Sequence, residues 1–172
     1  PLERLQKLRA LFFADAVSLG QQKMALTRQT PDFPENARWE HQGIVFATIN
    51  VPGSHNNKAM PKEKAARDTA NDAWIRAAFD GARAKSQRAV VIAMQANPFS
   101  SDIKRGPYAA ILRALTRETV NFSGEVLLIH GDTHRYRMDQ PLPDPRARAT
   151  LRDRKSTRLN SSHVALSRMP SS

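Results

Sequence analysis

The chain has 172 residues, of which 40% are hydrophobic and 25% are charged, a composition typical of one folded domain rather than of a disordered or fibrous protein. It contains no cysteine, which excludes disulfides and thiolate metal sites. No apolar run approaches the roughly 20 residues that a membrane-spanning helix needs. The formal charge of +11 suggests a polyanionic partner. However, the basic residues are scattered and do not alternate with aromatic residues as a base-stacking surface requires, so we do not expect nucleic acid as a partner.

The end of the chain differs in composition from the rest. Residues 155–172 (KSTRLNSSHVALSRMPSS) hold six serines, three basic residues and no acidic or aromatic residue. The run has no sustained helical or strand period, and it resembles a translated cloning adaptor. We therefore predict one domain over residues 1–153 and a disordered, non-native tail over residues 154–172. Without residues 155–172 the charge is still +8.

The first third of the chain predicts a helix and a β-hairpin. Leucines at helical spacing indicate an amphipathic helix over residues 2–14. Residues 23–29 predict a short strand that Pro31 and Pro34 would end. Residues 36–40 and 44–51 flank a turn, and the second arm, IVFATINV, is the first strong strand.

The remainder alternates helices with buried strands. A broad apolar face predicts a helix over residues 61–85. The continuous apolar runs AVVIAM (89–94) and VLLI (126–129) are typical of strands buried on both faces. A further helix is expected to begin near Pro107, and a short strand is expected over residues 135–138. This alternation predicts an α/β domain with a largely parallel sheet.

Polar side chains follow each of the three strong strands. The strand over 44–51 is followed by PGSHNN, the strand over 89–94 by Gln95, and the strand over 126–129 by HGDTH. Because ligands bind beyond the carboxyl ends of the strands in open α/β sheets, we expect these loops to converge. Their oxygen and nitrogen donors suit a divalent metal, and no glycine-rich phosphate loop occurs.

Each candidate also has an ordinary structural explanation. His130 could hydrogen-bond a backbone carbonyl, Gln95 could cap its loop, and the loop that contains Asn56 could be a polar turn. Asp132 and His134 lie two residues apart in a glycine-led turn, which lets both side chains reach one point.

The other conspicuous side chains are interpreted as structural. Both tryptophans are expected to pack in or against the core. Most arginines and the acidic residues on helices are expected to face solvent. In the helix over residues 61–85 that interpretation covers Arg67, Asp68, Arg76, Asp80 and Arg83.

Three of these runs resemble one protein family. VLLIHGDTHRYRMDQPL is similar to the last metal motif of the calcineurin-like metallophosphoesterases, which end a buried strand with Gly-His-x-His. Here Gly131, Asp132, Thr133 and His134 stand at the matching positions, so Asp replaces the first His. AVVIAMQANPF resembles the family's strand that ends in a metal-binding His, at the position of Gln95. ENARWEHQGIVFATINVPGSHNN resembles the strand and substrate-side loop of a divergent bacterial branch.

The resemblance covers about residues 1–145 and implies a fold and a reaction. The implied fold is α/β, a layered β-sandwich flanked by helices and incomplete in this chain. The family's Asp-x-His and Gly-Asp-x-x-Asp motifs are missing, and we expect them before Pro1. The implied activity of the full-length protein is phosphoester hydrolysis, in which two metals hold a hydroxide that attacks phosphorus. The fragment alone is expected to be inactive.

The resemblance also implies residue roles. His134 would ligate one metal, Asp132 and Gln95 would ligate or border the metal pair, and His130 and Asn56 would be catalytic groups on the substrate side. Oxygen donors at positions where the family has His favour Mn²⁺ or Mg²⁺ over Fe or Zn. The substitutions could instead mean that one metal site is lost.

A different class of function stays open at this point. The chain could be a non-catalytic basic domain that binds polyanions or nucleic acid. This alternative predicts salt-sensitive binding that does not depend on His134.

Overall fold

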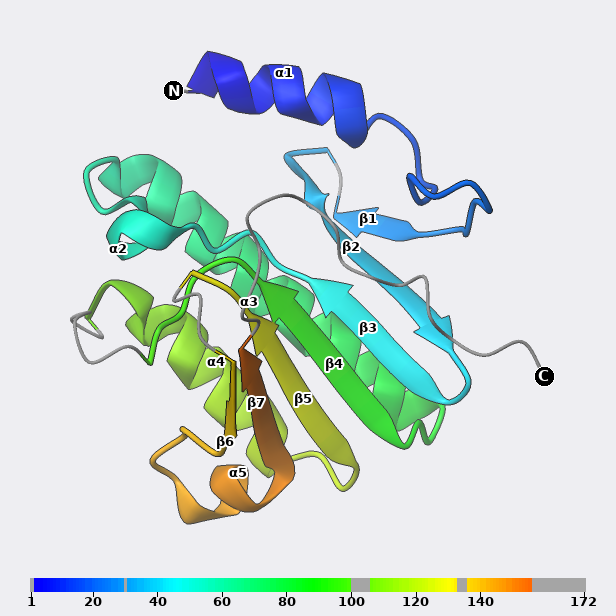
Figure 1. Ribbon diagram of the computed structural model, residues 1–172, viewed down its shortest axis with the longest axis vertical. Helices are drawn as coiled ribbons and strands as arrows, with labels where there is room; N and C mark the ends of the chain where they lie inside the picture. Colours follow the sequence, from blue (N-terminus) through cyan, green and yellow to red (C-terminus); the bar gives the residue numbers. More distant parts are fainter. Residues whose placement is uncertain (1, 30, 100–105, 133–135, 156–172) are drawn as a thin grey trace.

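The computed structural model describes residues 2–29, 31–99, 106–132 and 136–155. These residues form an α/β fold, a mixed sheet packed against helices (Figure 1). The strands are β1 (Thr27–Gln29), β2 (Phe33–His41), β3 (Ile44–Thr48), β4 (Ala89–Met94), β5 (Glu125–His130), β6 (Arg137–Asp139) and β7 (Leu151–Lys155). The helices are α1 (Leu2–Phe12), α2 (Gly53–Asn57), α3 (Pro61–Ala84), the short 3-10 turn η1 (Gly106–Tyr108), α4 (Ala109–Val120) and α5 (Pro145–Thr150).

The sheet has a parallel centre and antiparallel edges. Its order is β1-β2-β3-β4-β5-β7-β6, so the mixed five-stranded part β1 to β5 continues into β7 and β6. Strands β3, β4, β5 and β7 run parallel, and Val45, Val90 and Val126 stand side by side across the first three of them. The predicted α/β class and the largely parallel core are therefore confirmed.

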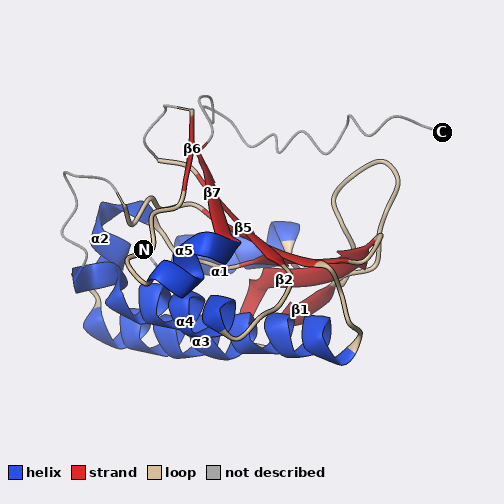
Figure 2. Ribbon diagram, turned by 90° about the horizontal axis from the view of Figure 1, so that it is seen from below, coloured by secondary structure: helices blue, strands red, loops and turns tan. Residues whose placement is uncertain are grey.

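The helices α3 and α4 cover one face of the sheet, as Figure 2 shows. Side chains that alternate along the strands point to this face and pack against both helices, and rings of Phe79 and Phe122 meet edge to face 5.5 Å apart. Each fully buried Leu, Ile or Phe contributes about 1.5–3 kcal/mol relative to an exposed one. The largest fully buried apolar side chains include Phe79, Ile75, Ile92, Ile111, Leu115 and Leu128.

The hairpin between β2 and β3 forms as predicted. Gln42 and Gly43 both have positive φ angles, 46° and 76°, which is the conformation of the two-residue turn that matches strand twist. Behind it, the rings of Trp39 and Phe46 stack at 5.2 Å between cross-strand partners. Trp74 is 8% exposed, so the packing role expected for both tryptophans is confirmed.

Two boundaries differ from the predictions. Pro34 lies inside β2 instead of ending a strand, because the β1–β2 register shifts there and a residue without an N–H can occupy the unpaired stretch. Helix α5 and strand β7 follow the proline-rich segment. Strand β7 reaches Lys155 and so extends past the predicted end of the domain at residue 153. Residues 156–172 lie outside the described residues. In the part of the chain that is described, no helix has the length and apolarity to cross a membrane.

Helix α1 forms as predicted but buries none of its residues. Leu8, Leu11 and Phe12 are 48%, 58% and 45% exposed. The helix is attached chiefly by Arg9, which makes two 2.8 Å contacts with the carboxylate of Glu35.

Candidate functional site

The loops after β3, β4 and β5 converge, as the sequence predicts. Beyond the ends of the strands, the backbone N–H of Ala96 donates to the carbonyl of Val51 at 3.0 Å. The N–H of Gly131 donates to the carbonyl of Gln95 at 3.1 Å. These hydrogen bonds tie the three loops together at the carboxyl edge of the parallel strands, where open α/β sheets bind ligands.

Asp132 lies against the start of the loop after β3. A Cβ atom at Gly53 would stand 3.0 Å from Oδ2 and 3.3 Å from Oδ1 of Asp132, so a glycine leaves room for this carboxylate. Asp132 is exposed and has a φ angle of 77°. Burial raises the pKa of Tyr108, and the nearby Asp132 carboxylate raises it further. The charge of Asp132 therefore acts on Tyr108, whose hydroxyl contacts the loop after β3.

The helical turn α2 is left-handed. The φ angles of Ser54, His55, Asn56 and Asn57 lie between 51° and 60°, although none of these residues is glycine. Each residue in this conformation costs roughly 1–2 kcal/mol, because its Cβ crowds the following carbonyl oxygen. Such strain persists only where the surrounding structure over-determines the backbone, and it clusters at functional sites.

Asn56 is the first anchor of this turn. Its side chain is 0% exposed, and its Nδ2 donates to Oδ1 of Asp68 and to the carbonyl of Pro107, both at 3.0 Å. Its backbone N–H donates to the hydroxyl of Tyr108 at 3.1 Å, and that hydroxyl lies 3.4 Å from the carbonyl of Pro52. These bonds fix the turn from the side of η1 and α3.

Arg67 is the second anchor. Its guanidinium donates to Oδ1 and the backbone carbonyl of Asn56, to the carbonyl of Asn50 at 3.3 Å, and to Glu63 at 2.7 Å. Burial alone would raise the pKa of Glu63, but hydrogen bonds from Arg67 and Asn57 hold it below its ordinary range. The buried cation is therefore compensated by an ionised partner.

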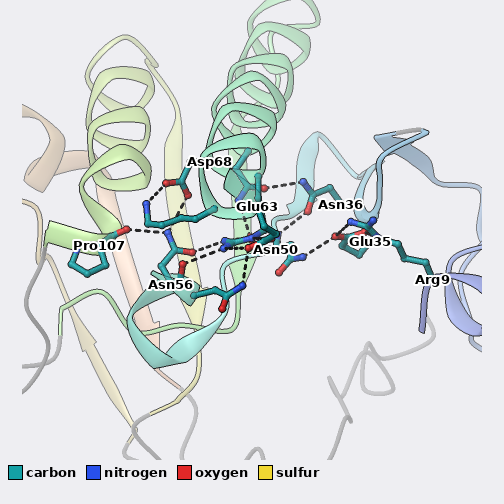
Figure 3. A network of polar contacts seen from close by, with 12 residues as sticks. Arg9, Glu35, Asn36, Asn50, Asn56, Glu63, Asp68 and Pro107 are labelled. Carbon is teal, nitrogen blue, oxygen red and sulfur yellow. Dashed lines mark hydrogen bonds and ion pairs between the residues drawn. The ribbon is translucent and has the colours of Figure 1, made fainter. Parts of the chain in front are cut away.

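The anchors belong to one polar network, which Figure 3 shows running from Arg9 through Glu35 and Asn50 to Asn56 and Pro107. The side chain of Asn50 donates to Glu35 at 2.7 Å. The backbone N–H of Asn50 donates to Oδ1 of Asn36, and its carbonyl accepts from Nδ2 of Asn71. The network joins α1, β2, α3 and η1 to the loop after β3.

The structure separates the predicted site residues into two groups. Gln95 and Asp132 are exposed at the ends of β4 and β5. Asn56 and His130 are 0% and 1% exposed. Nδ1 of His130 lies 3.4 Å from the carbonyl of Gly131, as in the ordinary explanation given above.

His134 and its neighbours 133 and 135 lie outside the described residues, so its predicted role as a metal ligand stays a prediction. Among the residues that the structure does describe, no three His, Asp or Glu side chains come close enough to hold a metal ion. Asp132 and Gln95 supply only part of a ligand set, and these two oxygen donors alone do not make a metal centre.

The interpretation of Arg67 and Asp68 as solvated is wrong, since they are 1% and 7% exposed. Helical spacing contains the signal that identifies them: positions 67, 71, 74 and 78 share one face of α3, and that face packs on the sheet. Charge alone suggested solvent, whereas periodicity places these residues at the buried end of the apolar face.

Comparison of the chain with protein-family models, with curated proteins and with solved structures finds no match. The metallophosphoesterase resemblance therefore stays a prediction from motifs.

Proposed function

We propose that the full-length protein is a metal-dependent phosphoester hydrolase whose site includes the carboxyl edge of β3, β4 and β5. The observation that carries this proposal is the approach of the Asp132 carboxylate to Gly53, which brings the loops after β5 and β3 to one point. Gln95, at the end of the strand between them, is bonded through its carbonyl to Gly131. Exposed oxygen donors at the carboxyl edge of a parallel sheet are in the usual position for binding a ligand.

In this proposal, some residues of the chain bind metal and others position the site. Asp132 and Gln95 are the metal-side donors in this proposal, and His134 is the third. Carboxylate and amide oxygens favour Mn²⁺ or Mg²⁺, and the proposal requires further ligands besides these three. Asn56 acts as a positioning residue, because its side chain is fully used by protein partners.

The layered β-sandwich belongs to the same proposal. On the face of the sheet opposite α3 and α4, Phe46, Val91 and Leu127 form one row across β3, β4 and β5. Trp39 extends the row by stacking on Phe46. Such a row favours a second layer packed on it, as in a sandwich of two sheets.

The test is hydrolysis of p-nitrophenyl phosphate and bis(p-nitrophenyl) phosphate by the full-length protein with Mn²⁺ or Mg²⁺. We expect His134→Ala and Asp132→Asn each to lower kcat/KM by more than about 100-fold, since changes behind the ligands alone cost about 10–100-fold. Asp80→Asn, on the exposed side of α3, is the matched control and should leave the rate unchanged.

Absence of hydrolysis with both metals would reject the enzyme. Salt-sensitive binding of heparin that His134→Ala leaves intact would instead favour the polyanion-binding alternative. Several arginines are already paired with acidic side chains, which weakens that alternative. The pairs include Arg83 with Asp80 and Glu118, and Arg117 with Asp72.

A further inference from the structure

A cavity of about 290 Å³ lies beside the candidate site, between α1 and the loop after β3. Leu2 and Leu5 of α1 line it from one side, and Pro52 and Met60 add further apolar surface. Gly53 also borders this cavity, and the same glycine faces the Asp132 carboxylate. The volume is at the lower end of small-molecule sites, so the cavity suits a ligand smaller than a typical drug.

The polar part of the lining carries no net charge. Arg67 and Glu63 both border the cavity, and they form an ion pair with each other at 2.7 Å. A charged ligand would find no unpaired counterion among these residues, whereas a neutral ligand disturbs no existing pair. The lining therefore favours an uncharged group.

The amide side chains in the lining present acceptors. The Nδ2 of Asn50 donates to Glu35 at 2.7 Å, and that of Asn57 donates to Glu63 at 2.8 Å. Each side chain thus keeps its Oδ1, which takes no hydrogen bond from the residues that the structure describes. The Ser54 hydroxyl, also in the lining, is exposed. Two carbonyl acceptors and a hydroxyl match a ligand that carries hydroxyl groups.

We propose that this cavity binds a neutral polyhydroxyl group, a sugar ring, with its hydroxyls on Asn50 and Asn57 and its C–H face against Leu2 and Leu5. The assignment of a substrate class to this cavity rests on the proposed function. Because Gly53 borders the cavity and also faces the Asp132 carboxylate, the sugar is the alcohol part of the phosphoester, and sugar phosphates are the substrate class.

Helix α1 forms one wall of the cavity although none of its residues is buried. Its ion pair with Glu35 uses the same carboxylate that accepts from Asn50. The wall formed by Leu5 is therefore separate from the core, whereas Arg67, which also lines the cavity, is buried.

The experiment is a titration of the ¹⁵N-labelled chain, without metal, with methyl β-D-ribofuranoside, followed by amide chemical shifts. We expect saturable, millimolar binding with shifts at Ser54 and Asn57. Leu5→Trp and Met60→Trp each place a larger side chain in the lining of the cavity, and each should weaken binding at least about tenfold. Leu8→Trp is the control, because Leu8 is exposed on the same helix outside the cavity.

Absence of saturable shifts, or unchanged binding by both filled variants, would overturn the inference. A second measurement separates it from the proposed function: kcat/KM of the full-length protein for ribose 5-phosphate against phenyl phosphate. Loss of the sugar preference in Leu5→Trp supports the cavity's role. Hydrolysis without any sugar preference or sugar binding rejects the cavity inference alone. Sugar binding without hydrolysis of either ester rejects the proposed function and leaves a sugar site.

Discussion

The polar residues at the carboxyl edge of the sheet fall into two regions that differ in burial. After β3, Asn56 and its partner Arg67 are buried and satisfied by other protein groups. After β4 and β5, Gln95 and Asp132 are exposed. Polar residues at the same edge of the sheet thus have different tasks. Those of the first region fix a backbone shape, and those of the second are donors accessible to a ligand.

The difference has an energetic reason. Four successive left-handed residues cost roughly 1–2 kcal/mol each, and such a turn forms only if buried hydrogen bonds offset that cost. Asn56 makes these bonds in both its backbone and its side chain. The exposed donors Gln95 and Asp132 have no comparable task, because no residue that the structure describes forms a hydrogen bond with their side chains. The comparison therefore predicts that changes after β3 affect stability, whereas changes after β4 and β5 affect function.

The largest expected effect is that of Arg67→Ala. Removing one partner from a buried ion pair costs about 3–5 kcal/mol, since the remaining groups lose their compensation. Urea unfolding followed by circular dichroism measures the loss. Arg76→Ala is the matched control on the same helix, because its side chain is 56% exposed and its pair with Asp72 should contribute less than about 1 kcal/mol. Equal losses in the two variants would refute the difference between the regions.

Tyr108→Phe should destabilise the protein by about 1–3 kcal/mol. The variant removes the hydroxyl that accepts from the N–H of Asn56 and leaves this buried donor without its partner. The same unfolding measurement detects the change, and the amide of Asn56 should exchange its hydrogen faster. Slow exchange in the variant would mean that Arg67 and Asp68 hold the turn without help from η1.

Much of the sheet could be predicted, because the local sequence pattern identifies its strands. The runs that form β4 and β5 are continuously apolar, and the apolar period of α3 is regular over many residues. The convergence of the three loops follows from parallel neighbours alone. These features depend on short-range pattern, which one sequence contains.

The left-handed turn and its anchors could not be predicted in the same way. Asn56 and Asn57 tolerate positive φ better than most residues, but nothing local identifies four such residues in succession. Arg67 becomes buried only because Asn50 and Asn56 meet it from another part of the chain. Helix α1 shows the opposite case, an apolar pattern that forms a helix but stays exposed. Both outcomes depend on tertiary contacts.

Acid should weaken the link between α1 and the loop after β3. Burial would raise the pKa of Glu35, but hydrogen bonds from Arg9, its own backbone and Asn50 outweigh burial and hold that pKa below its ordinary range. A carboxylate of lowered pKa stabilises the folded state above its unfolded pKa of about 4.3, and this stability is lost as the pH falls through the lower folded value. Glu35→Gln should cost about 1 kcal/mol at neutral pH and make the loss at acid pH shallower.

Unfolding midpoints between neutral pH and about pH 3 test this expectation. Glu3→Gln is the control, because Glu3 is an exposed residue in the first turn of α1. An acid limb that is equally steep in Glu35→Gln and the parent would assign the effect to other carboxylates, with Glu63 as the first candidate.

The smallest effect tests the contact between Gly53 in the first region and Asp132 in the second. In Gly53→Ala the new Cβ would stand 3.0 Å from Oδ2 of Asp132, so the carboxylate must move by a few tenths of an ångström. Because an exposed carboxylate moves easily, the expected loss of stability is below about 1 kcal/mol. Gly106→Ala is the control, since a Cβ there meets nothing within 4 Å. A double-mutant cycle with Asp132→Ala isolates the contact: the penalty of Gly53→Ala should disappear once the carboxylate is gone, with a coupling of about 0.5 kcal/mol. Zero coupling would mean that the two loops do not touch in solution, and the buried region would then shape a site to which Asp132 does not belong.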